Sequence, residues 1–309
     1  MPEIVPVCFR NGEGQQLVGM LHLPAVPVAG RPCILLLSPG VKMRVAPHRM
    51  YNKMAEAFVR EGFAVLRFDF SGLGDAEGEI KHTQLSHIYN SIQLGCYIDD
   101  TRAALDWLQA EHGFSRCIAG GLCGGALTGL LTAEHDQRIV GLLALGIPVA
   151  LDVGDAQWSA HLTRGQLDQL RQGYLSKLRD PASWLRLLSF KSDYRVIWKS
   201  IKRLFERNAP KPVAPTANGQ PTDNTNPRFA PAFFAMSQSR RPMLHIFSGS
   251  DRLAAEFKEK FQERDPERLA KHRDWVDIHV IDKANHILAH PDWFNEMLSV
   301  SCVWLRRFQ

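Results

Sequence analysis

Residues Cys117 to Ala126 read Cys-Ile-Ala-Gly-Gly-Leu-Cys-Gly-Gly-Ala, and this stretch decides the fold. A short apolar strand, Ile118 to Gly120, runs into a turn centred on Cys123, and a helical run follows at once. Gly121 and Gly125 stand two residues before and two residues after Cys123, where a sharp turn needs small side chains. The spacing therefore predicts a strand, a tight turn and a helix, with Cys123 at the tip of the turn.

The pattern Gly-x-Cys-x-Gly has the form of a nucleophile elbow, in which the central residue is usually Ser. A helix that begins behind Cys123 directs its N-terminal N–H groups and the positive end of its dipole at the sulfur. This arrangement favours a thiolate over a thiol. The structural alternative is that Cys123 is a small buried hydrophobic residue in a glycine-rich turn.

Composition places the chain among ordinary globular proteins: 45% of its 309 residues are apolar and 22% are charged. The net charge is +5. Much of the positive charge falls between residues 151 and 207, with four Lys and seven Arg against five Asp and one Glu. The total is too small to predict a nucleic-acid partner.

Cysteine usage and the N-terminus bear on cofactors and location. The six cysteines form no Cys-x-x-Cys pair, and no His cluster has zinc spacing, so we expect neither a metal nor an organic cofactor. The N-terminal residues lack the charged and apolar regions of a signal peptide. The longest apolar run, Cys33 to Leu37, is too short to span a membrane. These features predict a reducing, cytoplasmic location.

Predicted strands and helices alternate along most of the chain. An N-terminal hairpin at residues 5–10 and 16–23 precedes strands at 34–37, 64–70, 118–120, 140–145, 243–247 and 275–281. Helices are expected at 50–60, 99–109, 126–133, 254–263 and 293–308. This alternation predicts an α/β protein with a mostly parallel sheet covered by helices on both faces.

The pattern changes at Pro148. Residues 148–240 read as a basic helical insertion, which includes a proline-rich, flexible linker at 209–231. We therefore expect a core made of residues 1–147 and 241–309, interrupted by a helical cap. The basic face of the cap is either a solvated helix surface or a lid that meets an anionic carrier, an anionic sugar or a membrane surface.

Two polar residues follow strands in the second half of the core. Asp251 lies in the loop after the strand at 243–247, and His286 lies in the loop after the strand at 275–281. Sites in parallel sheets form at the carboxyl ends of strands, where Cys123 also lies. Each residue has a structural alternative: Asp251 could cap a helix and His286 could be a packed loop residue. His290 is a second candidate for the base.

The chain resembles the α/β-hydrolase superfamily in its elbow and in the order Cys123, Asp251, His286. The resemblance covers nearly the whole chain. The residues Asp69 to Gly78 resemble the superfamily's Asp-x-Arg/Ser-Gly-x-Gly-x-Ser-x-Gly loop, with Asp75 where Ser is usual. Ser38-Pro39-Gly40 stands where His-Gly is usual. Within the superfamily the chain looks like the serine-aminopeptidase-like hydrolases, and in its Gly-Leu-Cys elbow like bacterial hydrolases associated with the exosortase system. We interpret Asp75 as making a structural hydrogen bond.

The resemblance implies a role for each residue. Cys123 attacks an acyl carbonyl, His286 handles the proton and Asp251 orients the imidazole. The backbone N–H groups of Gly124 and Val41 would form the oxyanion hole.

Three functions follow from this interpretation. The first is hydrolysis of a carboxylic ester or thioester through an acyl-cysteine intermediate. The second is acyl transfer by the same triad in lipid or exopolysaccharide modification. The third is a non-catalytic binding protein on the hydrolase fold. The expected partner is a small acyl substrate, free or linked to a carrier, with transient membrane-surface contact by the cap as a further option. The sequence does not specify an oligomeric state.

Overall fold

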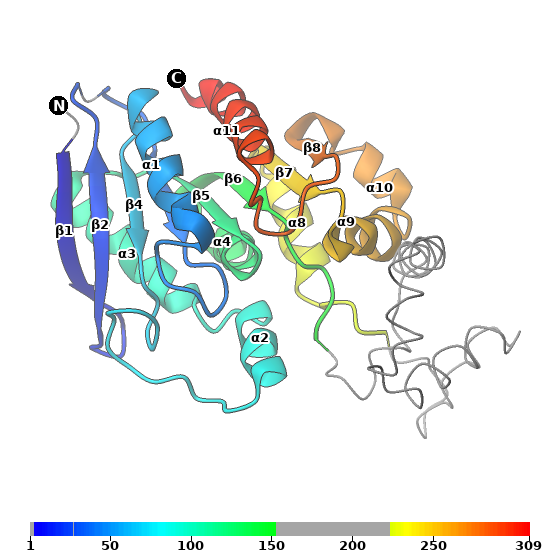
Figure 1. Cartoon of the computed structure of the whole chain (residues 1–309), viewed down its shortest axis with the longest axis horizontal. Coiled ribbons are helices and arrows are strands. Elements are labelled where there is room, and N and C mark those ends of the chain that lie inside the picture. Colours follow the sequence, from blue (N-terminus) through cyan, green and yellow to red (C-terminus); the bar gives the residue numbers. More distant parts are fainter. Residues whose placement is uncertain (1–2, 27, 153–222) are drawn as a thin grey trace, which may run out of the picture. The chain divides into compact units, whose positions relative to one another are not determined.

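The computed structural model describes residues 3–26, 28–152 and 223–309, and their centre is one eight-stranded sheet. The strands run in the order β1-β2-β4-β3-β5-β6-β7-β8 (Figure 1). Their bounds are β1 Glu3–Arg10, β2 Gln16–Leu23, β3 Cys33–Leu37, β4 Val65–Phe68, β5 Cys117–Leu122, β6 Ile139–Leu145, β7 Met243–Ser248 and β8 Val276–Ile281. The N-terminal hairpin pairs antiparallel, and all pairs from β4 to β8 are parallel. The predicted α/β fold with a mostly parallel sheet is confirmed.

Helices cover both faces of the sheet, because the central strands are buried on both sides. Helices α1 (Met50–Arg60) and α11 (Pro291–Leu305) pack on one face, where Phe58 and Trp304 join Ile118 and Leu143 in one core cluster. Helices α3 (Ile98–His112), α4 (Gly124–His135), α8 (Phe229–Gln238) and α9 (Arg252–Phe257) pack on the other face. The remaining elements are α2 (Leu85–Gln93), α10 (Pro266–Ala270) and the short turns Pro47–Arg49, Lys258–Gln262, Arg273–Trp275 and Arg306–Phe308.

Helix α4 lies in the core rather than at its surface. Every residue from Gly124 to Ala133 is buried, which fits a helix of small and apolar residues placed between the sheet and α8. The elbow therefore stands on a rigid base, since little of α4 can move without opening the core.

The proline-rich segment differs from its prediction at one end. We expected a loop through Pro231, but helix α8 begins at Phe229. Pro231 stands in the first turn of this helix, where N–H groups have no intrahelical acceptor, so proline costs little there. Apolar residues of α8, Phe229 and Phe233 among them, pack in the core cluster of α4. This burial outweighs the loop-forming tendency of the local sequence.

The described core also extends further than the boundaries predicted from the sequence. One compact unit comprises residues 1–152 and 225–309, so α8 belongs to it although the predicted cap ended at residue 240. Ala150 and Thr225 form an antiparallel bridge, and the N–H of Asn226 donates to the carbonyl of Val149 at 2.9 Å. The inserted segment therefore leaves and rejoins the core at adjacent points. The predicted basic cap helices and the linker up to residue 222 lie outside the described residues.

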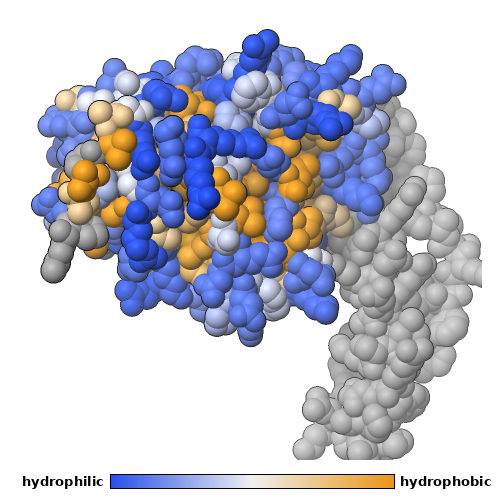
Figure 2. All heavy atoms as spheres, turned by 90° about the horizontal axis from the view of Figure 1, so that it is seen from above, coloured by the Kyte–Doolittle hydropathy of each residue, from blue (hydrophilic) through white to orange (hydrophobic). Residues whose placement is uncertain are grey.

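The surface of the described part mixes hydrophilic and hydrophobic side chains, as the face in Figure 2 shows. Large exposed apolar residues, such as Val26, Leu85 and Val303, are scattered over different elements. No helix in the described residues has the length and apolar content needed to cross a membrane.

Candidate active site

Cys123 lies between the end of β5 and the start of α4, as the elbow pattern predicts. Its backbone has φ of 55° and ψ of −117°, a conformation that non-glycine residues rarely adopt. Two backbone bonds hold it there: the N–H of Cys123 donates to Leu145 at 2.8 Å, and its carbonyl accepts from Leu127 at 3.2 Å. Strain of this kind persists where the surrounding structure enforces it.

Close packing against backbone atoms requires glycine at both positions that flank Cys123. A Cβ at Gly121 would lie 2.7 Å from the carbonyl carbon of Gly125, and a Cβ at Gly125 would collide with the carbonyl of Leu37. Both obstacles are backbone atoms, which cannot rotate away. The elbow is thus tight because strand, helix and neighbouring strand meet at these two positions.

Replacement of Gly121 by Ala should therefore destabilise the protein by about 1–3 kcal/mol, the usual cost of overpacking. Urea denaturation measures the change. Gly12→Ala is a matched control, because a Cβ there meets nothing within 4 Å. Equal stability of the two variants would contradict the close contact at the elbow.

Asp251 and His286 come together at the carboxyl ends of β7 and β8. His286 Nδ1 lies 2.6 Å from Asp251 Oδ2. Backbone hydrogen bonds hold the two loops beside each other. The N–H of Gly249 donates to the carbonyl of Ile281 at 2.9 Å, and that of Ser250 donates to the carbonyl of Ala284 at 3.0 Å. Parallel pairing of β7 with β8 thus places an acid and an imidazole side by side.

Asp251 performs two tasks. Its Oδ1 accepts from the N–H of Leu253 at 3.5 Å and caps helix α9, while Oδ2 faces the imidazole. The helix-cap alternative and the pairing with His286 are therefore both present in one side chain. The side chain of Asp251 is only 12% exposed, whereas that of His286 is 37% exposed, so the carboxylate is the more buried partner.

Cys123 also acts on the imidazole of His286. The interaction with Asp251 first, and then the interaction with Cys123, raise the pKa of His286 to about 10, against the opposing effect of burial. A ring with Nδ1 committed to a carboxylate presents Nε2 to the sulfur. The structure thus pairs His286 with Asp251, and Cys123 lies near enough to act on the same imidazole.

The second histidine considered in the sequence has a different position. His290 caps helix α11 by accepting from the N–H of Asp292 at 3.3 Å, and its side chain is 56% exposed. It contacts neither Asp251 nor Cys123 by any hydrogen bond in the described part of the chain.

The predicted oxyanion donors lie on two segments that touch. A Cβ at Gly124 would lie 3.1 Å from the Cα of Gly40 and 2.9 Å from Ile92 Cγ2, so the loop before Val41 packs directly against the start of α4. The N–H of Lys42 donates to Pro39 at 3.1 Å and closes a turn around Val41. Among the described residues, the N–H groups of Val41 and Gly124 have no protein acceptor.

The loop that follows Val41 is anchored by charge. Arg44 pairs with Asp69, which is fully buried, and with Asp75 at 2.6 Å. Asp69 also accepts from the backbone N–H of Arg44 at 2.6 Å and from that of Asp75 at 3.1 Å. The structural interpretation of Asp75 is confirmed. The loop from Asp69 to Gly78 thereby holds the segment that carries Val41.

Several residues around the site were not identified from the sequence. Helix α2 was missed, although its apolar residues Leu85, Ile88, Tyr89 and Ile92 have helical spacing. Tyr89 lies close to Gly40. Burial, and then the charge of Cys123, raise the pKa of the Tyr89 phenol. The side-chain amide of Asn90 makes two 2.8 Å bonds to the backbone of Asp152, where the inserted segment begins. Helix α2 therefore contacts both the loop at Gly40 and Asp152, the last described residue before the inserted segment.

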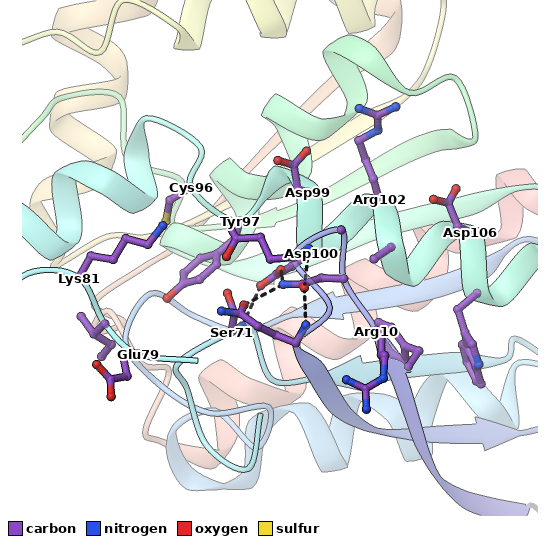
Figure 3. A pocket seen from close by; sticks show the side chains of 18 of the residues that line it. Arg10, Ser71, Glu79, Lys81, Cys96, Tyr97, Asp99, Asp100, Arg102 and Asp106 are labelled. Atoms are coloured by element: carbon purple, nitrogen blue, oxygen red, sulfur yellow. Dashed lines mark hydrogen bonds between the residues drawn. The ribbon is translucent and has the colours of Figure 1, made fainter. Parts of the chain in front are cut away.

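A cavity of about 990 Å³ lies elsewhere, between the β1–β2 hairpin loop and the start of α3 (Figure 3). None of the five predicted site residues lines it. Its buried carboxylate, Asp100, accepts from Asn11 Nδ2 and from the N–H of Ser71, both at 2.7 Å. Asp100 thus joins the loop of Asn11 to the loop of Ser71. The cavity is separate from the elbow that carries Cys123. In the described residues no group of three or more His, Cys, Asp or Glu side chains could hold a metal ion.

Comparison with solved structures identifies similar folds. An esterase from Pyrococcus furiosus, Pf2001, is 19% identical with a TM-score of 0.59, and the match covers 99% of this chain and 91% of that chain. The esterase domain of a Rhodothermus marinus protein is 18% identical with a TM-score of 0.54, and the match covers 99% of both chains. A dienelactone hydrolase from Anabaena variabilis is 14% identical with a TM-score of 0.54, with 99% and 98% covered.

No curated protein matches the sequence. A family model does: the model described as "Alpha/beta hydrolase family" matches residues 34–297, which include all strands from β4 to β8 and every residue of the candidate site. The chain belongs to the alpha/beta hydrolase family.

Proposed function

We propose that the protein is an enzyme that cleaves carboxylic esters or thioesters through an acyl intermediate on Cys123. One observation carries the proposal: Asp251 lies 2.6 Å from His286, whose pKa is raised by Asp251 and by Cys123 at the tip of the elbow. Nucleophile, base and orienting acid in hydrogen-bonded order are the arrangement that activates a nucleophile for acyl transfer. Similar structures, which include two esterases and a dienelactone hydrolase, support ester chemistry.

In the first half of the proposed reaction, Cys123 Sγ attacks the carbonyl carbon of the substrate as a thiolate. The carbonyl π electrons move onto oxygen, and the N–H groups of Gly124 and Val41 stabilise this oxyanion, each by about 3 kcal/mol. The intermediate collapses, the bond to the leaving oxygen or sulfur breaks, and His286 Nε2 gives its proton to the leaving group. The products are an alcohol or thiol and an acyl-cysteine.

In the second half, neutral His286 takes a proton from water as the oxygen attacks the thioester carbonyl. The second tetrahedral intermediate collapses with cleavage of the bond to Sγ, which releases a carboxylic acid. Throughout both halves Asp251 keeps Nδ1 protonated and stabilises the imidazolium. The thiolate and the imidazolium are then restored.

The nucleophile limits the substrate class. A thiolate is a good leaving group, so a tetrahedral intermediate with a poor leaving group returns to reactants. Esters of acidic alcohols, lactones and thioesters are therefore favoured over amides. We further propose a reducing, cytoplasmic location, which is supported by the six cysteines, all of them free.

A substrate panel tests the proposal. We expect turnover of p-nitrophenyl esters and acyl thioesters, and none of the matched p-nitroanilides, in assays of the full-length protein. Cys8→Ala, which removes an exposed cysteine on β1, should behave as wild type. Equal cleavage of esters and anilides, or no cleavage of any member, would contradict the proposed substrate class. Transfer of the acyl group to an added alcohol in preference to water would replace hydrolysis by acyltransfer.

A further inference from the structure

A tyrosine with no assigned role lies beneath the elbow. Tyr51 is the second residue of α1, is fully buried and packs in the core cluster between α1 and the sheet. A phenol in such a place needs partners for its hydroxyl, because an unpaired buried polar group is costly.

The hydroxyl of Tyr51 joins two strands beyond the end of their pairing. It donates to the carbonyl of Leu37 at 2.8 Å and accepts from the N–H of Leu122 at 2.7 Å. Ladder pairing of β3 with β5 ends at Leu37 and Gly121, so the phenol continues the connection one residue further. Both partners are backbone groups and cannot find new positions without moving their strands.

These two backbone groups lead directly into the two halves of the oxyanion hole. Leu37 ends β3 and precedes the segment of Ser38 to Val41, while Leu122 ends β5 and precedes Cys123 and Gly124. The N–H of Tyr51 also donates to Val45 at 3.2 Å, which holds the same loop after Val41. One residue thus touches the Val41 segment on both sides and the nucleophile strand at its tip.

We propose that Tyr51 is a positioning residue that sets the spacing between the two oxyanion donors, the N–H groups of Val41 and Gly124. This inference rests on the proposed acyl-cysteine chemistry. Burial raises the pKa of the phenol, so the hydroxyl remains protonated and can donate to Leu37. Donors for an oxyanion act through fixed geometry, and a shift of about 1 Å can cost roughly 100-fold in rate.

Tyr51→Phe tests the inference because it keeps the ring and removes only the hydroxyl. We expect the rate of acylation by the wild type's best p-nitrophenyl ester to fall about 10- to 100-fold, since the oxyanion donors lose their spacing. Alkylation of Cys123 by iodoacetamide should stay within about threefold of wild type, because alkylation develops no oxyanion. The binding of substrate should change little, so kcat should fall more than KM.

Tyr97→Phe is the matched control. Tyr97 is also buried, at 7% exposure, but stacks on Phe70 at 4.3 Å and bonds to neither strand of the elbow through its hydroxyl in the described chain. Its variant should acylate at the wild-type rate. A variant of Tyr51 that loses only thermal stability, with acylation unchanged well below its Tm, would overturn the inference, as would a parallel loss of acylation and alkylation.

Wild-type measurements keep the inference testable if Tyr51→Phe does not fold. The hydrogen bond to the phenol predicts that the amide of Leu122 exchanges with solvent only on global unfolding. Fast exchange of this amide by local opening would contradict the bridge. Absence of acylation in wild type, or equal acylation of Cys123→Ala, would overturn the proposed function together with this inference. Normal acylation in Tyr51→Phe would overturn this inference alone.

Discussion

Replacement of Cys123 by Ala should lower kcat/KM for aryl esters by at least about 10⁴-fold, the scale of losses when a triad nucleophile is removed. The physical reason is that His286 and Asp251 can only act on a nucleophile held beside them, and the elbow offers no second group at that position. Ala fits the strained turn, because Cys123 already carries a Cβ there and Ala adds no further atom. We therefore expect the fold and its Tm to be retained while the chemistry is lost.

Spectroscopy and kinetics separate these effects. Circular dichroism and the urea midpoint check the fold of Cys123→Ala, and initial rates of p-nitrophenol release check the activity. Cys302→Ala is a suitable control, because Cys302 is a partly buried cysteine on α11, far along the sequence from the elbow. Comparable activity in Cys123→Ala and Cys302→Ala would contradict a nucleophilic Cys123.

Asp251→Asn should give the second large loss, about 10²- to 10⁴-fold in kcat/KM, because the amide no longer provides a charged acceptor for Nδ1–H. The helix cap at Leu253 should survive, since asparagine also accepts hydrogen bonds as an N-cap. The loss should therefore fall on activity more than on stability. Asp282→Asn, an exposed carboxylate in the loop before His286, provides the control.

The pH dependence offers a further measurement on the same variant. The interactions with Asp251 and Cys123 raise the pKa of His286 to about 10, so we expect the ring to keep its proton up to about that pH. Because the protonated ring supplies the proton to the leaving group, acylation should fall as the pH rises through about 10. Removal of the Asp251 charge lowers the pKa of His286, and the alkaline limb should move to lower pH. An unchanged limb in Asp251→Asn would contradict the role assigned to this pair.

The positions of Cys123, Asp251 and His286 at one edge of the sheet could be predicted because each residue follows a strand. The carboxyl ends of parallel strands lie at the same edge of a sheet. Because β7 and β8 are parallel neighbours, the loops that follow them bring Asp251 and His286 together. The elbow could also be predicted from a short stretch of sequence, because Gly121 and Gly125 stand where a Cβ would collide with backbone atoms. Buried strands such as Cys33–Leu37 are apolar throughout and were predicted to within a residue.

Other parts of the site depend on contacts that no local pattern encodes. The partners of Tyr51 are a carbonyl and an N–H, which every residue possesses, so only the assembled sheet reveals them. Arg44 meets Asp69 across 25 positions of sequence, and its charge alone does not indicate which acid it will bind. Helix α8 formed against a loop-like sequence because burial against α4 outweighed the local signal at Pro231.

Helix α2 also joins several parts of the described core. Helix α2 touches the Val41 loop through Tyr89 and the start of α4 through Ile92, and Asn90 binds the backbone at Asp152. Helix α2 therefore contacts both the Val41 loop and Asp152, the last described residue before the inserted segment.

The central claim is that an acyl group is carried by Cys123, and intact-mass spectrometry during turnover tests it most directly. Wild-type protein mixed with p-nitrophenyl esters of graded chain length and quenched in acid should gain the mass of one acyl group. Peptide mapping should place this group on Cys123, and Cys123→Ala should gain nothing. Turnover without an adduct on Cys123, or an adduct of equal yield in Cys123→Ala, would contradict the account.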